Sequence, residues 1–147
     1  MLRGAVDCDL DAVAYVWRES ARNTDGVAPE IPSLEQLRSR IDHELANEWN
    51  LSVAVEEGEI IAMLAIKPIT SELDQLFVLP RKQGCGIGLE LLRRAKTLMP
   101  EGFTLRTASA NHRARRFYER AGLALLEEGV HPAGGYSVCY YGWNANR

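Results

Sequence analysis

The segment "LDQLFVLPRKQGCGIGLELLRRAK", residues 73–96, runs from an apolar stretch into an amphipathic one through three glycines at alternate positions. Residues 73–78 favour a β-strand, and Leu89, Leu92 and Ala95 recur at helical spacing. A turn from a strand into a helix presents successive backbone N–H groups, and the helix dipole adds partial positive charge. Glycine lets a ligand approach that backbone closely. The segment therefore predicts a cradle for a phosphate-bearing ligand, with a plain tight turn as the alternative.

Two well-known nucleotide motifs do not fit this glycine turn. The dinucleotide fingerprint G-x-G-x-x-G needs glycine at its sixth place, where this sequence has Leu89. The phosphate loop of NTPases needs Gly-Lys-Ser/Thr, and this sequence has Gly88-Leu89-Glu90. Both interpretations are therefore rejected.

The stretch "QGCGIG" resembles the Q/R-x-x-G-x-G/A signature of the GCN5-related N-acetyltransferase (GNAT) family, with Gln83, Gly86 and Gly88 in the defining places. The preceding "LFVLP" is similar to the strand plus proline that usually comes before this signature. In that family the turn cradles the pyrophosphate of acetyl-CoA. The resemblance therefore identifies the expected anion as that of a CoA thioester.

A second stretch downstream, "NHRARRFYERAGL", is similar to the family pattern N-x-x-A-x-x-F-Y-x-x-x-G-F. The matching residues are Asn111, Ala114, Phe117, Tyr118 and Gly122. Leu123 stands where relatives usually have phenylalanine, which keeps the position apolar. The resemblance is specific over residues 51–123, and outside that range it rests on the order of elements.

Hydrophobic periodicity and turn residues divide the whole chain into alternating elements. Strands are predicted at 2–6, 51–57, 60–68, 72–80, 103–110, 123–130 and 136–143, and helices at 7–20, 33–49, after the glycines to about residue 99, and at 112–121. Asp7 or Asp9 can cap the first helix, Ser33 with Gln36 forms a capping box, and Asn111 can cap the last. The order β-α-α-β-β-β-α-β-α-β-β resembles an α/β GNAT fold: a mixed, mostly antiparallel central sheet of six to seven strands flanked by about four helices, in one domain spanning 1–147.

Composition excludes several other classes of protein. The chain has 147 residues, is 46% hydrophobic and 25% charged, and carries a formal net charge of −3, so it offers no broad surface for nucleic acid. Its three cysteines are far apart and odd in number, which predicts neither a disulfide framework nor a metal site. No apolar stretch is long enough to span a membrane, and the N-terminal residues include acids where a signal peptide needs an apolar block. We expect a cytoplasmic protein without membrane contact.

The resemblance implies an N-acetyltransferase that moves an acetyl group from acetyl-CoA, as co-substrate, to a primary amine by direct attack in a ternary complex. A non-catalytic CoA-binding sensor of the same fold is the alternative. The implied donor site consists of Leu76, Phe77, Val78, Arg81, Gln83, Gly84, Cys85, Gly86, Ile87, Gly88, Asn111, Arg115 and Tyr118. Lys82, Arg116 and Arg120 are further candidates for phosphate contacts.

The resemblance also implies catalytic roles. Tyr118 would protonate the departing thiolate, and the backbone N–H of Val78 would stabilise the oxyanion. Asp74, four places before Val78, is the implied base, and strand alternation predicts that both share one face with Leu76. An unpaired carboxylate there would have a raised pKa. Glu72 acting through a water, one of His43, His112 and His131, or ordered water without a dedicated base are the alternatives.

The amine acceptor is left open by the sequence. Relatives hold it with their first helices and last strands, which here contain Trp17, the loop 23–32 and residues 129–141. Asp25 and Glu30 could attract a cationic amine, although two loop acids are ordinary surface residues. A small amine, an amino-acid derivative and a protein N-terminus or lysine all remain candidates. The aromatic final strand suits a homodimer interface as well as a core.

Overall fold

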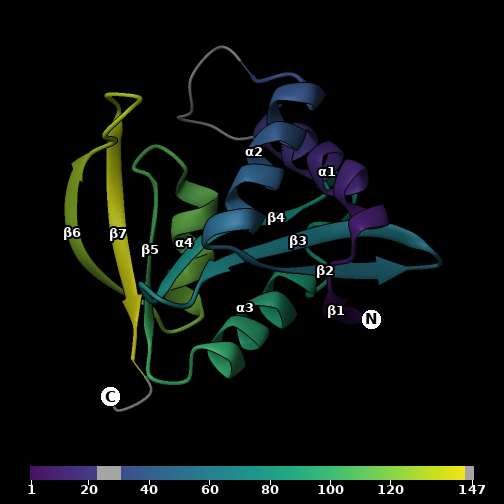
Figure 1. The fold of residues 1–147 in the computed structure, drawn as a ribbon. Helices are drawn as coiled ribbons and strands as arrows, with labels where there is room; N and C mark the ends of the chain where they lie inside the picture. Colours follow the sequence, from purple (N-terminus) through teal and green to yellow (C-terminus); the bar gives the residue numbers. More distant parts are fainter. Residues whose placement is uncertain (23–30, 145–147) are drawn as a thin grey trace.

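The structure is a computed structural model that describes residues 1–22 and 31–144. Figure 1 shows its elements in the predicted order. They are β1 (Leu2–Gly4), the 3-10 turn η1 (Asp7–Asp9), α1 (Leu10–Arg22), α2 (Leu34–Asn47), β2 (Asn50–Glu56), β3 (Glu59–Lys67), β4 (Glu72–Val78), the 3-10 turn η2 (Pro80–Lys82), α3 (Ile87–Leu98), β5 (Phe103–Ala108), α4 (His112–Arg120), β6 (Ala124–Val130) and β7 (Ser137–Trp143).

The strands form one seven-stranded sheet in the order β1-β2-β3-β4-β5-β7-β6, which confirms the predicted mixed fold. Adjacent strands are antiparallel except β4 and β5, which run parallel and pair at Glu72 and Thr104. β7 is paired on both sides, with β5 and with β6. Neither edge of β7 is therefore free to pair with a strand of a second copy of the chain.

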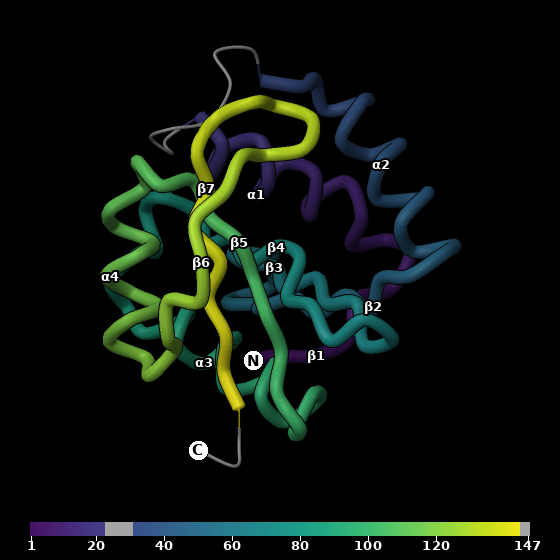
Figure 2. Tube along the Cα trace, turned by 90° about the vertical axis from the view of Figure 1, so that its left-hand side faces the viewer, coloured from purple at the N-terminus to yellow at the C-terminus, as the bar shows by residue number. Residues whose placement is uncertain are grey.

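Helices cover both faces of the β2–β4 part of the sheet, with α1 and α2 on one side and α3 on the other (Figure 1). The apolar residues that recur along α1, such as Val13 and Trp17, are buried, as their spacing predicted. β3 is inaccessible on both faces between Ala62 and Ile66, and its sequence is a nearly continuous apolar run. In Figures 1 and 2 the β6–β7 connection lies at the same end of the molecule as α1 and α2.

Local capping explains several of the boundaries. Ser33 and Gln36 form the predicted capping box at the start of α2, with bonds of 3.1 and 2.8 Å. The side chain of Asn111 accepts the Ala114 N–H at 3.1 Å and caps α4. Glu57, with φ of 51°, and Gly58, with φ of 78°, make the predicted hairpin turn between β2 and β3.

Asp9 does not cap the first helix in the way that the sequence suggested. Its carboxylate accepts the backbone N–H of Val6 at 2.8 Å and two bonds from the Arg3 guanidinium at 2.6 and 3.1 Å. The helix begins one residue later, at Leu10. Buried Asp9 therefore ties the first helix to β1 through Arg3.

None of the helices within the described ranges has the length and apolar composition that crossing a membrane requires.

Asp9→Asn should lower the free energy of unfolding at pH 7, and the difference from the wild type should narrow at pH 3. The hydrogen bond from Arg3 holds the pKa of Asp9 below its usual value. A lowered carboxyl pKa stabilises the fold above the unfolded value of about 4, and this stabilisation is lost as the pH falls through the folded value. Urea unfolding at the two pH values measures the difference. Exposed Asp7→Asn is the control, and an equal deficit of Asp9→Asn at both pH values would contradict the assignment.

Candidate active site

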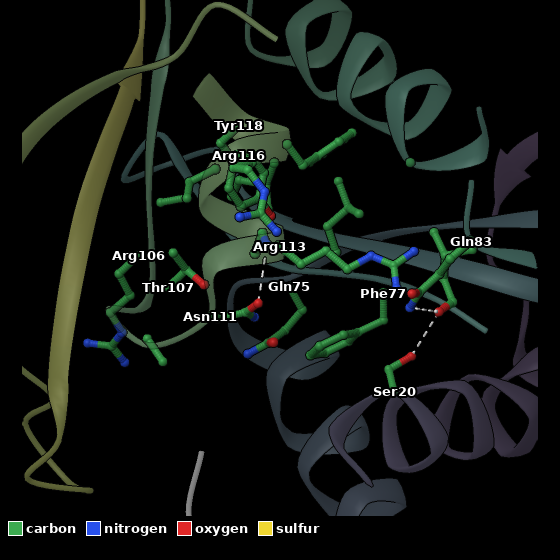
Figure 3. Close-up of a pocket in the computed structure, with 18 of the residues that line it drawn as sticks. Ser20, Gln75, Phe77, Gln83, Arg106, Thr107, Asn111, Arg113, Arg116 and Tyr118 are labelled. Atoms are coloured by element: carbon green, nitrogen blue, oxygen red, sulfur yellow. Dashed lines mark hydrogen bonds between the residues drawn. The ribbon is translucent and has the colours of Figure 1, made fainter. Parts of the chain in front are cut away.

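A cleft of about 930 Å³ opens where β4 and β5 separate (Figure 3). Its walls are residues 73–78 of β4, residues 105–108 of β5, the glycine turn with the start of α3, one side of α4, and His131, Tyr136 and Val138 near the β6–β7 connection. The two parallel strands pair at Glu72 and Thr104, near the start of each strand. They separate beyond this pair, and the cleft lies between them.

The glycine turn enters α3 through left-handed backbone. Gly84 has φ of 84° and Gly86 has φ of 85°, a region that other residues adopt at a cost. Gly86 is the N-cap of α3 and supplies no side-chain cap, so the first N–H groups of the helix are left for a ligand. Gly88 allows close packing, because a Cβ there would lie 3.3 Å from Cζ of Phe117. The turn therefore has the left-handed glycines and the uncapped helix start that an anion cradle requires.

Gln83 fastens this turn to the end of β4. Its Nε2 donates to the Val78 carbonyl oxygen at 3.2 Å, and the buried Ser20 hydroxyl of α1 donates to the same oxygen at 3.2 Å. Sequence reasoning missed Ser20, because no local signal links residues that lie 58 positions apart. Both hydrogen bonds hold the carbonyl of the peptide that joins Val78 to Leu79, directly after the N–H that is predicted to stabilise the oxyanion.

The backbone of β4 presents N–H groups to the cleft. Leu79 N donates to Ile61 O at 2.9 Å, so Leu79 and Ile61 belong to the hydrogen-bonded set of the β3–β4 ladder. Antiparallel ladders alternate, so the N–H groups of Val78 and Leu76 point away from β3 toward the β5 side. Val78 N–H is therefore directed at the space between β4 and β5.

The prediction that Asp74 shares a face with Val78 is wrong. The β3–β4 register passes from Ala65↔Gln75 to Ile66↔Leu73, which leaves Asp74 as the extra residue of a β-bulge. Leu73, not Asp74, therefore shares the face of Leu76 and Val78.

The Asp74 carboxylate lies on the side of the sheet that α1 and α2 cover. Its Oδ2 accepts the Trp49 Nε1–H at 2.8 Å, so it is not the unpaired group that the sequence suggested. Trp49 packs on Trp17, with ring centroids 5.7 Å apart, and Trp17 stacks on Phe77 at 6.2 Å. Asp74 still lines the cleft, whereas Glu72 does not.

Tyr118 reaches the cleft from α4 with its ring enclosed. The residue is 8% exposed and packs against Phe117 at 5.2 Å and Tyr141 at 6.2 Å between ring centroids. Burial raises the pKa of Tyr118 to about 12. Within residues 1–22 and 31–144, no group forms a hydrogen bond with its hydroxyl. A protonated hydroxyl at neutral pH thus lies at the cleft wall.

Four of the predicted donor-site residues do not line the cleft. Arg81 pairs with Glu59, Cys85 is exposed, Ile87 is buried in the hydrophobic core, and Arg115 donates to the Tyr141 hydroxyl and the Ser109 carbonyl. The remaining predicted residues, Leu76, Phe77, Val78, Gln83, Gly84, Gly86, Gly88, Asn111 and Tyr118, line it.

The cations that do line the cleft come mainly from one face of α4. Arg113, Arg116 and Arg120 recur at helical spacing, and Lys82 joins them from η2. In Figure 3 Arg113 extends from α4 toward Gln83. Arg113 was missed from the sequence, although its spacing from Arg116 and Arg120 was the available signal.

The expected acceptor region is only partly described. Trp17 backs Phe77 and does not itself line the cleft, and Asp25 and Glu30 lie outside the described residues. Among residues 1–22 and 31–144, no group of three His, Cys, Asp or Glu side chains could hold a metal ion.

Comparison with known proteins adds independent information on this fold and sequence. The model of the acetyltransferase (GNAT) family matches residues 13–123. A search of curated proteins gives no match.

Solved structures that resemble the chain share its fold at low sequence identity. An acetyltransferase from Thermus thermophilus has a TM-score of 0.81 and 18% identity, over 98% of this chain and 96% of the other. PaiA N-acetyltransferase from Thermoplasma acidophilum, in complex with coenzyme A, has a TM-score of 0.76 and 22% identity over 97% and 98%. Salmonella typhimurium yncA, with its cofactor acetyl-CoA, has a TM-score of 0.77 and 14% identity over 99% and 93%.

The family model spans the glycine turn, β4 and the helix that carries Tyr118, all of which line the cleft. The chain belongs to the acetyltransferase (GNAT) family.

Proposed function

We propose that this protein, as a single domain of residues 1–147, transfers an acetyl group from acetyl-CoA to a primary amine by direct attack in a ternary complex. One observation carries the proposal: the uncapped start of α3, the outward N–H of Val78 and the hydroxyl-bearing Tyr118 meet in one cleft. The CoA in the PaiA structure and the acetyl-CoA in the yncA structure support acetyl-CoA as the acetyl donor.

The donor's charges match the groups on one side of the cleft. The N–H groups at the start of α3, with the helix dipole behind them, would bind the pyrophosphate. Arg113, Arg116 and Arg120 face the same cleft and would neutralise phosphate charge. The outward N–H groups of β4 would hold the pantetheine arm in an extended, strand-like position.

The chemistry needs one proton removed and one delivered. The amine nitrogen attacks the thioester carbon, and the Val78 N–H donates to the oxygen that becomes negative. The C–S bond then breaks as the amide forms. Tyr118 gives its proton to the thiolate, which its high pKa allows because the hydroxyl is protonated at neutral pH.

Asp74 is the proposed base. Oδ2 is held by Trp49, while Oδ1 has no hydrogen bond among the described residues and can take the amine proton directly or through water. Its position on the α1 and α2 side supports an approach of the amine from that side, opposite the helices proposed to bind the donor.

Gly86→Ala should weaken CoA binding by about tenfold, the loss expected when a hydrogen bond to a charged group is broken. A Cβ at Gly86 meets no atom within 4 Å, so the effect comes from the left-handed backbone, which costs alanine about 1–2 kcal/mol and turns the amides away. Gly58→Ala is the matched control, since Gly58 also has positive φ and open space but lies in the β2–β3 turn. Calorimetric titration with CoA checks this, and equal affinities of both variants would contradict it.

Tyr118→Phe should lower kcat about 10²-fold, the typical contribution of a general acid, and leave the Kd of acetyl-CoA unchanged. The hydroxyl has no partner among the described residues, so its removal should not disturb the fold. Tyr15→Phe, on the exposed face of α1, is the control. Free thiol release during turnover is the measurement. Unchanged kcat would remove the acid role, and tight acetyl-CoA binding without transfer to any amine would support the non-catalytic sensor.

Asp74→Asn should lower kcat about 10²-fold with alkylamines that are protonated at the assay pH. The loss should be smaller for an arylamine, because that amine is already neutral and needs no proton removed before attack. Glu72→Gln is the control, since Glu72 lies outside the cleft. Full activity of Asp74→Asn, or an equal loss in Glu72→Gln, would overturn the assignment.

A further inference from the structure

Positive charge also lies at the end of the cleft that the donor site does not use. Arg106 of β5 lines the cleft, and in Figure 3 its side chain points away from Arg113 and Arg116. No carboxylate of residues 1–22 and 31–144 forms an ion pair with it. Since the arginines of α4 are the proposed phosphate partners, Arg106 is available for a different anion.

Arg40 of α2 carries a second guanidinium, but it does not itself line the cleft. Its Cζ lies 4.9 Å from the centroid of the Trp17 ring. Trp17 stacks on Phe77, which lines the cleft. Its neighbour on α2, Arg38, pairs with Asp11 and Asp42, whereas Arg40 has no ion-pair partner in the described part of the chain.

His131 completes this end of the cleft as a hydrogen-bond donor. Its Nδ1 accepts the N–H groups of Ala133 at 3.1 Å and Gly134 at 2.8 Å, so the neutral ring carries its hydrogen on Nε2. The ring stacks on Tyr136, with centroids 4.8 Å apart. Burial lowers the pKa of His131, and the positive charges of Arg106 and Arg40 lower it further. His131 and Arg106 both line the cleft.

Since it rests on the proposed amine acetylation, the inference concerns the acceptor. We propose that the acceptor is a small amine that carries a carboxylate, and that Arg106 binds this carboxylate at the β5 wall of the cleft. Guanidinium groups bind carboxylates through paired, charge-assisted hydrogen bonds. The Nε2–H of His131 adds a neutral hydrogen-bond donor to the Arg106 guanidinium.

The charges also argue against the opposite class of acceptor. A polyamine or a lysine-rich peptide would bring further cations to Arg106, and like charges repel. The aromatic wall of Phe77, backed by Trp17, suits the apolar part of a small acceptor. Asp74 lies on the same side of the sheet as Trp17, where it can take the proton of the amine.

Matched acceptors test the proposal. Each set contains an α-amino acid, its carboxamide and the amine that lacks the carboxylate, with the same side chain throughout. We expect the amino acid of at least one set to have a kcat/KM about tenfold above its two analogues, the effect of a charged hydrogen bond. Arg106→Gln should remove most of this preference by raising the KM of the amino acid, while the KM of acetyl-CoA stays unchanged.

Arg93→Gln is the matched control, because Arg93 is an exposed arginine of α3 outside the cleft. Equal use of the three acceptors in every set, or a preference that survives in Arg106→Gln, would overturn the inference. Preference for a peptide that begins with the same residue over the free amino acid would overturn the small-molecule part.

A binding measurement separates this inference from the proposed function. N-acetylated amino acids, the expected products, are titrated into the protein saturated with CoA. If no amine is acetylated but these carboxylates bind, and bind about tenfold more weakly to Arg106→Gln, the transferase function fails and the anion site stands. If amines are acetylated but carboxylate has no effect on binding or turnover, the function stands and the anion site fails.

Discussion

β4 and β5 run parallel, share a register at Glu72 and Thr104, and then diverge, so that backbone N–H groups of β4 face a cleft instead of a neighbouring strand. Unpaired backbone donors away from water are costly, and a strand with such donors is suited to a ligand that adopts an extended form. The other features of the site depend on this separation. The glycine turn follows the end of β4, and Tyr118 enters the same space from α4.

The end of β4 is held from two directions. Gln83 comes from the turn that follows the strand, and Ser20 comes from α1, yet both donate to the carbonyl oxygen of Val78. The next peptide N–H, that of Leu79, is fixed by Ile61 of β3. Such restraint matters for an oxyanion donor, because electrostatic stabilisation of a transition state requires dipoles that are already oriented. α1 thus contributes to the site although it brings no catalytic group.

Charge divides the cleft into two parts. Arg113, Arg116 and Arg120 share one face of α4, whereas Arg106 of β5 lines the cleft together with His131. Tyr118 lies buried at the wall as a neutral group, because burial raises its pKa. Many other basic side chains of this chain are neutralised locally, as Arg81 is by Glu59. The arginines that line the cleft therefore come from two elements, α4 and β5.

The sequence by itself determined the order of the elements, the capping box of Ser33, the cap at Asn111, the glycine turn and the position of Tyr118. These features depend on hydrogen bonds and periodicity within a few residues, so a short segment contains the whole cause. Only the tertiary structure decided which side of the sheet Asp74 occupies, which partners Arg81 and Arg115 take, and that Ser20 lines the cleft. A bulge depends on the register with another strand, and an ion pair depends on which distant side chain is nearest. Segments brought together from across the chain make those choices, because sequence distance does not measure distance in the fold.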